Sequence, residues 1–551
     1  MRLGISWAGW SSESVKPIDI RPGDLETVRR ILAEHVLERE VRAFGSRVAW
    51  TAKEFSDLDL AVMGEEPLSA SVLGRLSEAF TESNLPFKVD VVAWATTKES
   101  FRRIIEKECV VVQEGGKRKV GLAGEWRVEP LERLLEPERA ISYGIVQPGA
   151  PTSDGVPIVR VTDIRDGRIA TTDPLRVSRE IEATYGRTRL RGGELLLTLV
   201  GTVGEAAVVP ESLAGWNTAR AVAVIPVRAD VGSYWVKLAL RSPEVRHIID
   251  SRLNTTVQAT LNLRDVAQLP IVMPPDAQRR AIAHILGTLD DKIELNRRMS
   301  ATLEAMARAL FKSWFVDFDP VRAKAEGRDS GLPKPLADLF PDRLVDSELG
   351  EMPEGWEVKS LDEIARFLNG LALQKYPPMD HRSLPVIKIA QLRAGNTTGA
   401  DRACADLDAD YVVRDGDILF SWSGSLECSL WAGGEGALNQ HLFKVTSATY
   451  PRWLCYLGVH AHLDDFRHIA AGKATTMGHI QRHHLSDAKL PVPPTLLLDA
   501  MSKQLEPMIA SIWKREVESR TLAALRDTLL PKLISGELRV RDAEKLAGRV
   551  A

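Results

Sequence analysis

The chain has 551 residues, with 44% hydrophobic residues, 27% charged residues and a formal net charge of −3. This length exceeds what one hydrophobic core supports, so we expect a multidomain α/β (α+β) protein with three or more domains. No apolar run approaches the roughly 18 residues that a membrane helix needs, which excludes a membrane-spanning protein and a membrane partner.

The opening residues MRLGISWAGW make a poor signal peptide, and the four cysteines lack metal-ligand spacing. We therefore expect a cytoplasmic protein with reduced thiols. Nothing in the net charge predicts a polyanionic partner. Binding to DNA would depend on local basic patches or on a basic partner protein.

Two apolar stretches near the N-terminus, FSDLDLAVM at 55–63 and FKVDVVAW at 87–94, predict β-strands that carry acidic residues. Asp57 and Asp59 are two residues apart, so both side chains project from the same face of a strand. If the second strand is its neighbour, Asp90 joins them. Three converging carboxylates are the oxygen-rich arrangement that binds Mg²⁺ beside substrate phosphates, so we expect a magnesium site here.

The segment GSR before the first of these strands predicts a phosphate-binding turn. Gly45 and Ser46 open a turn that we expect to lead into a helix, where backbone N–H groups and a hydroxyl would hold a nucleoside triphosphate. Arg47 would help to neutralise the phosphates. The spacing GS-x(10)-D-x-D therefore predicts a nucleotide site beside the carboxylates.

Residues 21–115 resemble the minimal nucleotidyltransferases, the polymerase-β-like family that includes the MNT antitoxins. The resemblance implies transfer of a nucleotide, often AMP, to a hydroxyl. It implies catalytic metal ligands at Asp57, Asp59 and Asp90. This chain departs from the family at Trp50, because the family usually has a glycine shortly after the arginine. A bulky residue there would narrow the nucleotide entry or indicate an altered activity.

An internal repeat organises most of the remaining chain. The aligned pairs keep their order at offsets of 221–228 residues, which indicates duplication of a module of about 220 residues. The pairs are PIVRVTDIRDG (157–167) with PVIKIAQLRAG (385–395), GELLLTLVGT (193–202) with GDILFSWSGS (416–425), RHI (246–248) with RHI (467–469), and QLPIVMPP (268–275) with KLPVPP (489–494). Short alternating strands, punctuated by glycine and proline, fill the first two-thirds of each copy.

Each copy ends in a stretch that predicts a long helix, and the first begins at Asp276 after two prolines. Spacings of four and three, as in a coiled coil, relate Leu289, Ile293, Asn296, Ser300, Leu303, Ala307, Leu310 and Trp314. The second helix has Met508, Ile512, Leu522, Leu529 and Leu533 in matching columns, interrupted by Arg515 and Arg526. We expect the two helices to pack on each other. The alternative is that each packs only on its own domain.

Three motifs and the two LP…PP endings together resemble the specificity (S, HsdS) subunit of type I restriction-modification systems. The motifs are MARALFKSWFVDFDPVRAK (306–324), LVDSELGEMPEGWEV (344–358) and LRDTLLPKLISGEL (525–538). The resemblance covers residues 126–541. It implies two target-recognition domains that each read half of a split, asymmetric sequence in double-stranded DNA. It also implies antiparallel helices that set the gap between the halves, with two methyltransferase subunits and restriction-translocase subunits as partners, and no cofactor for this part.

These features predict the following order along the chain. We expect an N-terminal extension (1–20), a nucleotidyltransferase-like domain (21–115), a linker (116–125), target-recognition domain 1 (126–274), a spacer helix (275–316), a linker (317–354), target-recognition domain 2 (355–494), a second spacer helix (495–541) and a tail (542–551).

Candidate DNA contacts are polar residues in equivalent loops of the two copies, since base reading needs amides or guanidiniums and phosphate contacts need basic or hydroxyl groups. In the first copy they are Thr202, Asn217, Arg220, Arg252, Thr255, Thr256, Gln258 and Asn262. In the second they are Ser423, Ser425, Asn439, Gln440, Lys473, Thr475, Thr476, His479, Gln481 and Arg482. We expect no metal at His479, His483 and His484, because no cysteine or carboxylate completes a site.

Three functions remain open from the sequence. The first is DNA specificity within a restriction complex, with a nucleotidyltransferase domain fused in front. The second is Mg²⁺-dependent transfer of AMP to a protein or RNA hydroxyl, with the repeat as a targeting scaffold. The third is a phage-defence device in which the front domain modifies a partner when restriction is disturbed.

Overall fold

The computed structural model describes residues 18–36, 39–53, 56–64, 68, 70–114, 126–253, 259–378, 382–472 and 478–548. The chain forms two compact units. One unit comprises Met1–Ala283 with Leu530–Val540, and the other comprises His284–Leu529 with Arg541–Ala551. Among the described residues, no helix is both long and apolar enough to cross a membrane.

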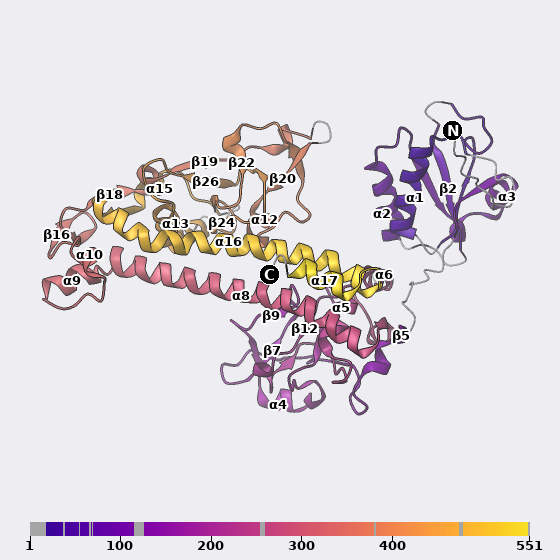
Figure 1. The fold of residues 1–551 in the computed structure, drawn as a ribbon, viewed down its shortest axis with the longest axis horizontal. Coiled ribbons are helices and arrows are strands. Elements are labelled where there is room, and N and C mark those ends of the chain that lie inside the picture. The colour runs from indigo at the N-terminus through magenta and orange to yellow at the C-terminus, as the bar shows by residue number, and fades with distance from the viewer. Residues whose placement is uncertain are drawn as a thin grey trace, which may run out of the picture. The chain divides into compact units, whose positions relative to one another are not determined.

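The N-terminal domain is a four-stranded sheet in the order β3-β2-β1-β4, with helices on both faces (Figure 1). Its strands are β1 (Val41–Phe44), β2 (Leu58–Val62), β3 (Val89–Ala93) and β4 (Cys109–Gln113). Its helices are α1 (Pro22–Val36), α2 (Ala70–Thr81) and α3 (Glu99–Lys107). Leu58 and Leu60 pack with residues of α1 and α2 in one core, whereas Ala61 packs with Ile105 of α3 in another. Alternation along β2 therefore turns Asp59 toward the face that α3 covers.

The first repeat begins and ends in a strand pair, β5 (Arg127–Pro130) with β15 (Pro270–Met273). Between them, one sheet has the order β12-β11-β14-β6 and another has the order β10-β7-β13. Their strands are β6 (Ser142–Tyr143), β7 (Val156–Val159), β10 (Leu175–Val177), β11 (Leu195–Thr198), β12 (Ala206–Val208), β13 (Asn217–Thr218) and β14 (Val222–Ile225). Strands β8 (Ile164–Arg165) and β9 (Arg168–Ile169) form a hairpin, and the helices are α4 (Arg179–Ala183), α5 (Ser233–Leu240), α6 (Pro243–Ser251) and α7 (Leu263–Ala267).

The second repeat has the same plan, framed by β18 (Glu357–Ser360) with β27 (Lys489–Val492). Its sheets have the orders β19-β26-β23-β24 and β21-β20-β25-β22. The strands are β19 (Arg366–Asn369), β20 (Ser383–Ile387), β21 (Arg402–Cys404), β22 (Val412–Val413), β23 (Ile418–Ser421), β24 (Cys428–Leu430), β25 (Gly436–Leu438) and β26 (Leu442–Thr446). The helices are α11 (Leu361–Ile364), α12 (Ile389–Ala394), α13 (Arg452–Ala461), α14 (Leu463–Ala471) and α15 (His483–Asp487).

Strand pairing shows that the aligned segments of the two copies occupy the same places in the fold. The first aligned segments form β7 and β20, which pair in parallel with β13 and β25. The second form β11 and β23, the inner strands of the four-stranded sheets. The duplication predicted from the sequence is therefore a duplication of structure.

Two helices of 40 residues, α8 (Asp276–Phe315) and α16 (Thr495–Ile534), follow the repeats. Within residues 284–529 they run antiparallel, because Asp290 contacts Arg526 whereas Ser300 contacts Ile512. The positions predicted for the contact face of α8 are all buried or half-buried, including the polar Asn296 and Ser300. The expectation that the helices pack on each other is confirmed over this stretch.

The arginines that were expected to interrupt the contact face of α16 instead meet polar partners on α8. Arg526 Nη1 donates to Asp290 Oδ1 at 2.6 Å, and Arg515 Nη1 donates to Asn296 Oδ1 at 3.4 Å. Asn296 Nδ2 also donates to Glu518 Oε2 at 2.8 Å. A buried polar layer of this kind favours one register of two helices, at some cost in stability.

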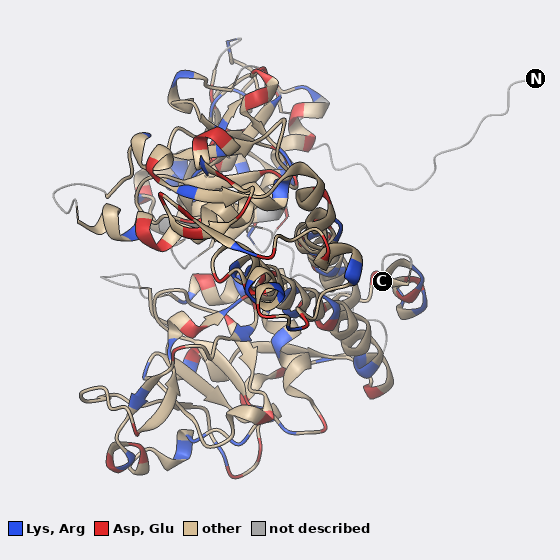
Figure 2. Cartoon of the chain, turned by 90° about the vertical axis from the view of Figure 1, so that its left-hand side faces the viewer, with Lys and Arg blue, Asp and Glu red and all other residues tan. Residues whose placement is uncertain are grey.

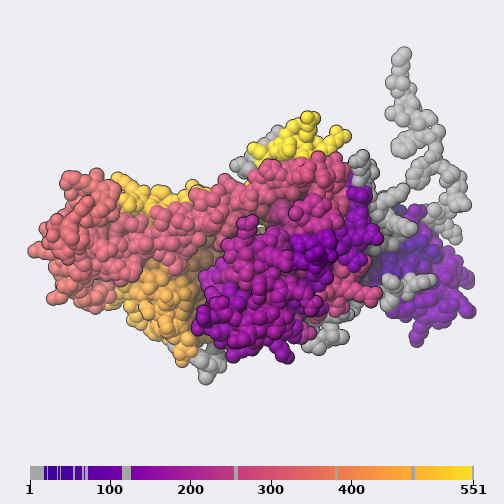
Figure 3. Space-filling view, turned by 90° about the horizontal axis from the view of Figure 1, so that it is seen from below, coloured from indigo at the N-terminus to yellow at the C-terminus, as the bar shows by residue number. Residues whose placement is uncertain are grey.

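Residues 317–354, expected as a linker, form a strap that packs at the end of α8 (Figure 1 and Figure 3). The strap contains α9 (Asp319–Ala325), α10 (Lys334–Ala337) and the hairpin of β16 (Leu344–Ser347) with β17 (Gly350–Pro353). Phe340 lies against Trp314, with ring centroids 6.3 Å apart, and Lys324 Nζ donates to the carbonyl of Phe340 at 2.6 Å. The strap therefore belongs to the core that joins α8 to the second repeat.

Candidate functional site

Asp59 and Asp90 lie on adjacent strands, whereas Asp57, which was expected on the same strand as Asp59, immediately precedes β2. Strands β2 and β3 pair in parallel, with Asp59 directly opposite Asp90. Burial raises the pKa of Asp59 above its ordinary value, and the nearby charges of Asp90 and Asp57 raise it further. Lys88 acts in the opposite direction. The site therefore holds an excess of negative charge that a bound cation would relieve.

The ammonium group of Lys88 lies 2.5 Å from Asp90 Oδ1 and partly offsets this charge. Among the described residues, no three His, Cys, Asp or Glu side chains are grouped closely enough to hold a metal ion as they stand. The donors are nevertheless carboxylate oxygens, the ligands that Mg²⁺ prefers, and they face a common side of the sheet. Their chemistry fits a divalent cation that replaces Lys88 as the counter-charge of Asp90.

The turn after β1 passes directly over Asp59. Gly45 has φ +81°, and a β-carbon on it would lie 2.5 Å from Asp59 Oδ2. Only glycine permits both this backbone conformation and this close approach. The backbone N–H groups of Val48 and Ala49 donate to the Gly45 carbonyl at 3.1 and 3.0 Å. The segment is therefore a single turn, and the helix expected after Ser46 does not form in the described residues.

Arg47 differs from its expected role as a phosphate ligand. Its side chain is buried, and its Nε and Nη2 donate to the Ser56 carbonyl at 2.9 and 2.7 Å. Its Nη1 donates to the Asp19 carbonyl at 2.8 Å, and the guanidinium stacks over Phe87. Arg47 thus anchors the segment that enters β2. The sequence could not show this, because the carbonyl partners carry no side-chain signature.

Trp50, which occupies the place of the family's glycine, has φ 57°. This left-handed conformation is the one that glycine adopts without steric cost. The indole is 56% exposed. The backbone at Trp50 therefore keeps the shape that a glycine would give, while the side chain projects from the turn.

In the first repeat, the loop between β11 and β12 carries the candidate Thr202 at its exposed tip. Thr198 holds the base of this loop, because its hydroxyl donates to the Thr202 carbonyl and accepts from the Glu205 N–H at 2.9 Å. The backbone of the loop also pairs with residues 259–261, through Gly201 N to Ala259 O at 3.2 Å and Leu261 N to Leu199 O at 2.9 Å.

The equivalent loop of the second repeat, between β23 and β24, has the same construction. The Ser421 hydroxyl donates to the Ser425 carbonyl at 2.6 Å and accepts from the Glu427 N–H at 2.8 Å. Its backbone pairs with residues 478–480, through Gly424 N to Gly478 O at 2.8 Å and Ile480 N to Trp422 O at 3.0 Å. In each copy the structure thus places this loop beside the polar stretch that precedes the LP…PP ending, a proximity that the sequence did not predict.

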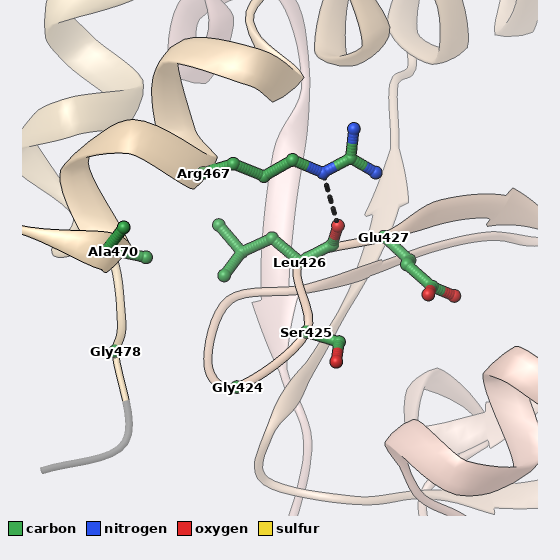
Figure 4. A pocket seen from close by; sticks show the side chains of 8 residues that line it. Gly424, Ser425, Leu426, Glu427, Arg467, Ala470 and Gly478 are labelled. Atoms are coloured by element: carbon green, nitrogen blue, oxygen red, sulfur yellow. Dashed lines mark hydrogen bonds between the residues drawn. The ribbon is translucent and has the colours of Figure 1, made fainter. Parts of the chain in front are cut away.

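A pocket of about 410 Å³ lies beside this second loop, lined by Gly424, Ser425, Leu426, Glu427, Arg467, Ala470, Ala471 and Gly478 (Figure 4). Ser425 is exposed, whereas Ser423 is buried and its hydroxyl shares a hydrogen bond of 3.0 Å with His441 Nδ1. His479 lies edge-on to Trp422. Trp422 and His441 were not anticipated at this loop from the sequence, whereas His479 was named as a candidate DNA contact.

Two asparagines proposed as base readers are buried and structural. Asn217 Nδ2 donates to Glu182 Oε1 at 3.1 Å, and its Oδ1 accepts from the Thr218 N–H at 2.8 Å. Asn439, in the equivalent strand, donates to Gln440 Oε1 and accepts from the His441 N–H. Their amides are therefore directed into the domains. Sequence pattern alone does not separate such residues from surface amides.

The other candidates divide by position. Arg220, Asn262, Gln481 and Arg482 are exposed, and Arg252, Gln440 and His479 are half-buried. Arg252 Nη1 donates to the Asp265 carbonyl at 3.2 Å, and Asn262 Nδ2 donates to Asp265 Oδ2 at 3.3 Å. Thr255, Thr256, Gln258, Lys473, Thr475 and Thr476 lie outside the described residues. Basic and acidic residues are interspersed over the helices and loops (Figure 2).

Comparison with known proteins matches the N-terminal domain and the two repeats to two different families. Residues 26–115 match the family described as polymerase beta, nucleotidyltransferase. Residues 151–305 and 353–500 match the type I restriction modification DNA specificity domain.

Individual relatives agree with this division. The chain is 52% identical over 101 residues to a probable protein adenylyltransferase MntA of Haemophilus influenzae, covering 18% of this chain and 89% of the relative. It is 25% identical over 354 residues to the type I restriction enzyme HindI specificity subunit of the same organism, covering 53% and 73%. It is 24% identical over 367 residues to the MjaIX specificity subunit of Methanocaldococcus jannaschii, covering 64% and 78%.

Proposed function

Because the chain belongs to the type I restriction-modification DNA specificity family and carries a polymerase-β-type nucleotidyltransferase domain in front, we propose that it is the sequence-specificity subunit of a type I restriction-modification complex. Each repeat would read one half of a bipartite, asymmetric target in double-stranded DNA. The observation that carries this proposal is the structural duplication, in which each copy presents an equivalent loop at the end of an inner strand. Polar loops held on a rigid scaffold can carry side chains to base edges.

The helices α8 and α16 would set the gap between the two half-sites and dock two methyltransferase subunits, which in turn would associate with restriction-translocase subunits. Exposed apolar side chains on these helices support a docking role. Leu295 and Met306 of α8 are 44% and 47% exposed, and Leu496 of α16 is 68% exposed. Isolated exposed apolar residues are common, but their presence on the outer faces of a helix pair fits contact with further subunits.

Binding measured with and without the methyltransferase subunits encoded beside this chain tests the proposal. We expect specific DNA binding that needs the methyltransferase subunits and weakens steeply with salt, because phosphate contacts release counterions. Exchanging residues 355–494 for the equivalent domain of a relative should change one half of the recognised sequence and leave the other. Binding without any sequence preference in the full assembly would contradict the proposal.

We also propose that the N-terminal domain is a nucleotidyltransferase that moves AMP from ATP to a hydroxyl of a protein in the cytoplasm. The close approach of the Gly45 turn to Asp59 supports this second function, because it places phosphate-binding N–H groups beside acidic side chains. Asp57, Asp59 and Asp90 would hold Mg²⁺, which would supply positive charge to activate the attacking hydroxyl and neutralise the leaving pyrophosphate. Gly45 and Ser46 would hold the triphosphate, while Arg47 keeps the entry to β2 in place.

Incubation of the full chain with ATP labelled at the α-phosphate, Mg²⁺ and the proteins encoded beside it tests this activity. We expect covalent label on one protein, and loss of that label in an Asp57→Asn variant. Label that persists in Asp57→Asn would come from another enzyme. Absence of label with every candidate protein, despite specific DNA binding, would contradict the second function and leave the first intact.

A further inference from the structure

The tripeptide RHI recurs at residues 246–248 and 467–469, yet neither proposed function gives it a role. We propose that Arg246 and Arg467 are positioning residues that fix the base-reading loops, residues 199–205 in the first repeat and 422–427 in the second. Each arginine would then set specificity for one half-site only. This inference rests on the proposed role in DNA specificity and deepens it.

In the first repeat, Arg246 extends from α6 to the end of the loop. Its Nη1 donates to the Gly204 carbonyl at 2.9 Å. Gly204 has φ +87°, and a β-carbon there would lie 2.3 Å from the same Nη1 atom. The guanidinium therefore lies against the bare backbone of the loop, at a distance that only glycine allows.

In the second repeat, Arg467 extends from α14 to the equivalent place (Figure 4). Its Nε donates to the Leu426 carbonyl at 3.2 Å, and its Nη1 donates to Asp464 Oδ1 at 2.9 Å. Leu426 is buried, whereas its neighbours Gly424 and Ser425 are exposed. The arginine thus holds the buried base of a loop whose tip is free to contact DNA.

Each arginine also connects the two polar stretches of its domain. Helices α6 and α14 end at Ser251 and Ala471, just before the stretches that contain the remaining candidate DNA contacts. Those stretches return to pair with the same loops, through Gly201 N to Ala259 O and Gly424 N to Gly478 O. One guanidinium therefore fixes the loop relative to the helix from which the second stretch departs.

The physical consequence is preorganisation of the loop tips. The loops are held from inside by the hydroxyls of Thr198 and Ser421, from one side by strand-like pairing, and from the helix by an arginine. Discrimination between bases depends on hydrogen-bond geometry, so a loop that drifts loses selectivity before it loses affinity for phosphates. Removing one arginine should therefore reduce base discrimination at one half-site.

The test uses the full chain assembled with its methyltransferase subunits, and the readout is the methylated motif determined by sequencing of modified DNA. We expect Arg467→Ala to reduce base discrimination about tenfold at one half-site, and Arg246→Ala to do so at the other. Arg467→Lys, which retains one donor, should restore much of the selectivity. Ser421→Ala, which weakens the same loop from inside, should affect the same half-site as Arg467→Ala.

Arg452→Ala is the matched control. Arg452 Nη1 also donates to a glycine carbonyl, that of Gly416 at 3.2 Å, but this glycine lies at the opposite end of β23. We expect an unchanged motif. Equal loss at both half-sites, or an unchanged motif in every variant, would overturn the inference. Absence of any split motif with the unsubstituted chain would instead overturn the proposed DNA specificity itself.

Discussion

Asp59 Oδ2 lies 2.5 Å from the point where a β-carbon on Gly45 would stand, so the carboxylate and the turn fit together only when residue 45 is glycine. Gly45→Ala would displace the turn or the Asp59 carboxylate and would also be strained at φ +81°. We expect nucleotide binding by the full chain, measured calorimetrically with a non-hydrolysable ATP analogue and Mg²⁺, to weaken at least about tenfold, because the backbone donors would move.

Gly74→Ala provides the control for this substitution. Gly74 lies in α2, and a β-carbon there would meet nothing within 4 Å. Alanine in a helix interior is more favourable than glycine by about 0.5–1 kcal/mol, so this variant should be slightly more stable. It should bind the nucleotide as the unsubstituted chain does. Equal binding by both variants would show that the Gly45 turn is not part of the nucleotide site.

Trp50→Gly should stabilise the turn, because Trp50 has a left-handed backbone conformation with φ 57°. That conformation costs a non-glycine residue roughly 1–2 kcal/mol. Glycine avoids this cost, but the greater conformational entropy of the unfolded chain with glycine offsets part of the gain in stability. We expect hydrogen exchange of the amides of Val48, Ala49 and Thr51, which donate within the turn, to slow about two- to fivefold. Trp50→Ala, which keeps the strain, should give no such slowing.

Replacing one partner of the Asp290–Arg526 ion pair should destabilise the protein strongly, whereas replacing both partners with apolar residues should have a small effect. Their side chains are 18% and 11% exposed, so loss of one partner leaves a charge in a poorly hydrated place. We expect Asp290→Leu alone to lower the free energy of unfolding by about 3 kcal/mol. The double variant Asp290→Leu/Arg526→Met should regain most of this loss. Denaturant unfolding measures both, and additive losses in the double variant would show that the pair does not interact.

His460 should make the stability of the unit formed by residues 284–529 and 541–551 sensitive to acid. Burial and the adjacent charge of Arg308 lower the pKa of His460 from 6.5 to about 4, and Arg308 Nη2 lies 2.9 Å from its Nδ1. The unfolded chain therefore binds this proton at a higher pH than the folded chain does. The contribution of neutral His460 to the free energy of unfolding is complete above pH 6.5 and is lost as the pH falls through about 4.

Unfolding by denaturant at about pH 7 and about pH 5 measures this effect as a fall in the free energy of unfolding. His460→Leu should reduce the fall, because no imidazole remains to be protonated. His468→Gln is the control, since His468 is exposed on α14. An equal fall in the unsubstituted chain and in His460→Leu would assign the acid sensitivity to other groups.

Regular patterns in the sequence predicted the large features of the fold. The repeat and the burial of Asn296 and Ser300 follow from spacing, because strand and helix periods decide which residues share a face. Asp90 was expected beside Asp59 only if the two strands were neighbours, and the strand pairing supplies that condition. Spacing does not identify partners that are distant in sequence. Asn217 pairs with Glu182, and Arg526 pairs with Asp290, 236 residues away.

The roles of individual arginines were the hardest feature to predict from the sequence. Arg47 looks like a phosphate ligand beside Gly45 and Ser46, but it binds backbone carbonyls that every sequence possesses. Conversely, Arg246 and Arg467 were visible as a repeated tripeptide, without any indication of what they hold. Only the folded chain shows that both reach the base of an equivalent loop.

Sequencing of modified bases in the genome of the host, with and without this chain, tests the central claim most directly. The claim predicts a methylated motif made of two short specific halves separated by a fixed, unspecific gap, which disappears when the chain is deleted and returns when it is restored. A set of methylated motifs that is identical with and without the chain, while its methyltransferase subunits are present, would contradict the claim.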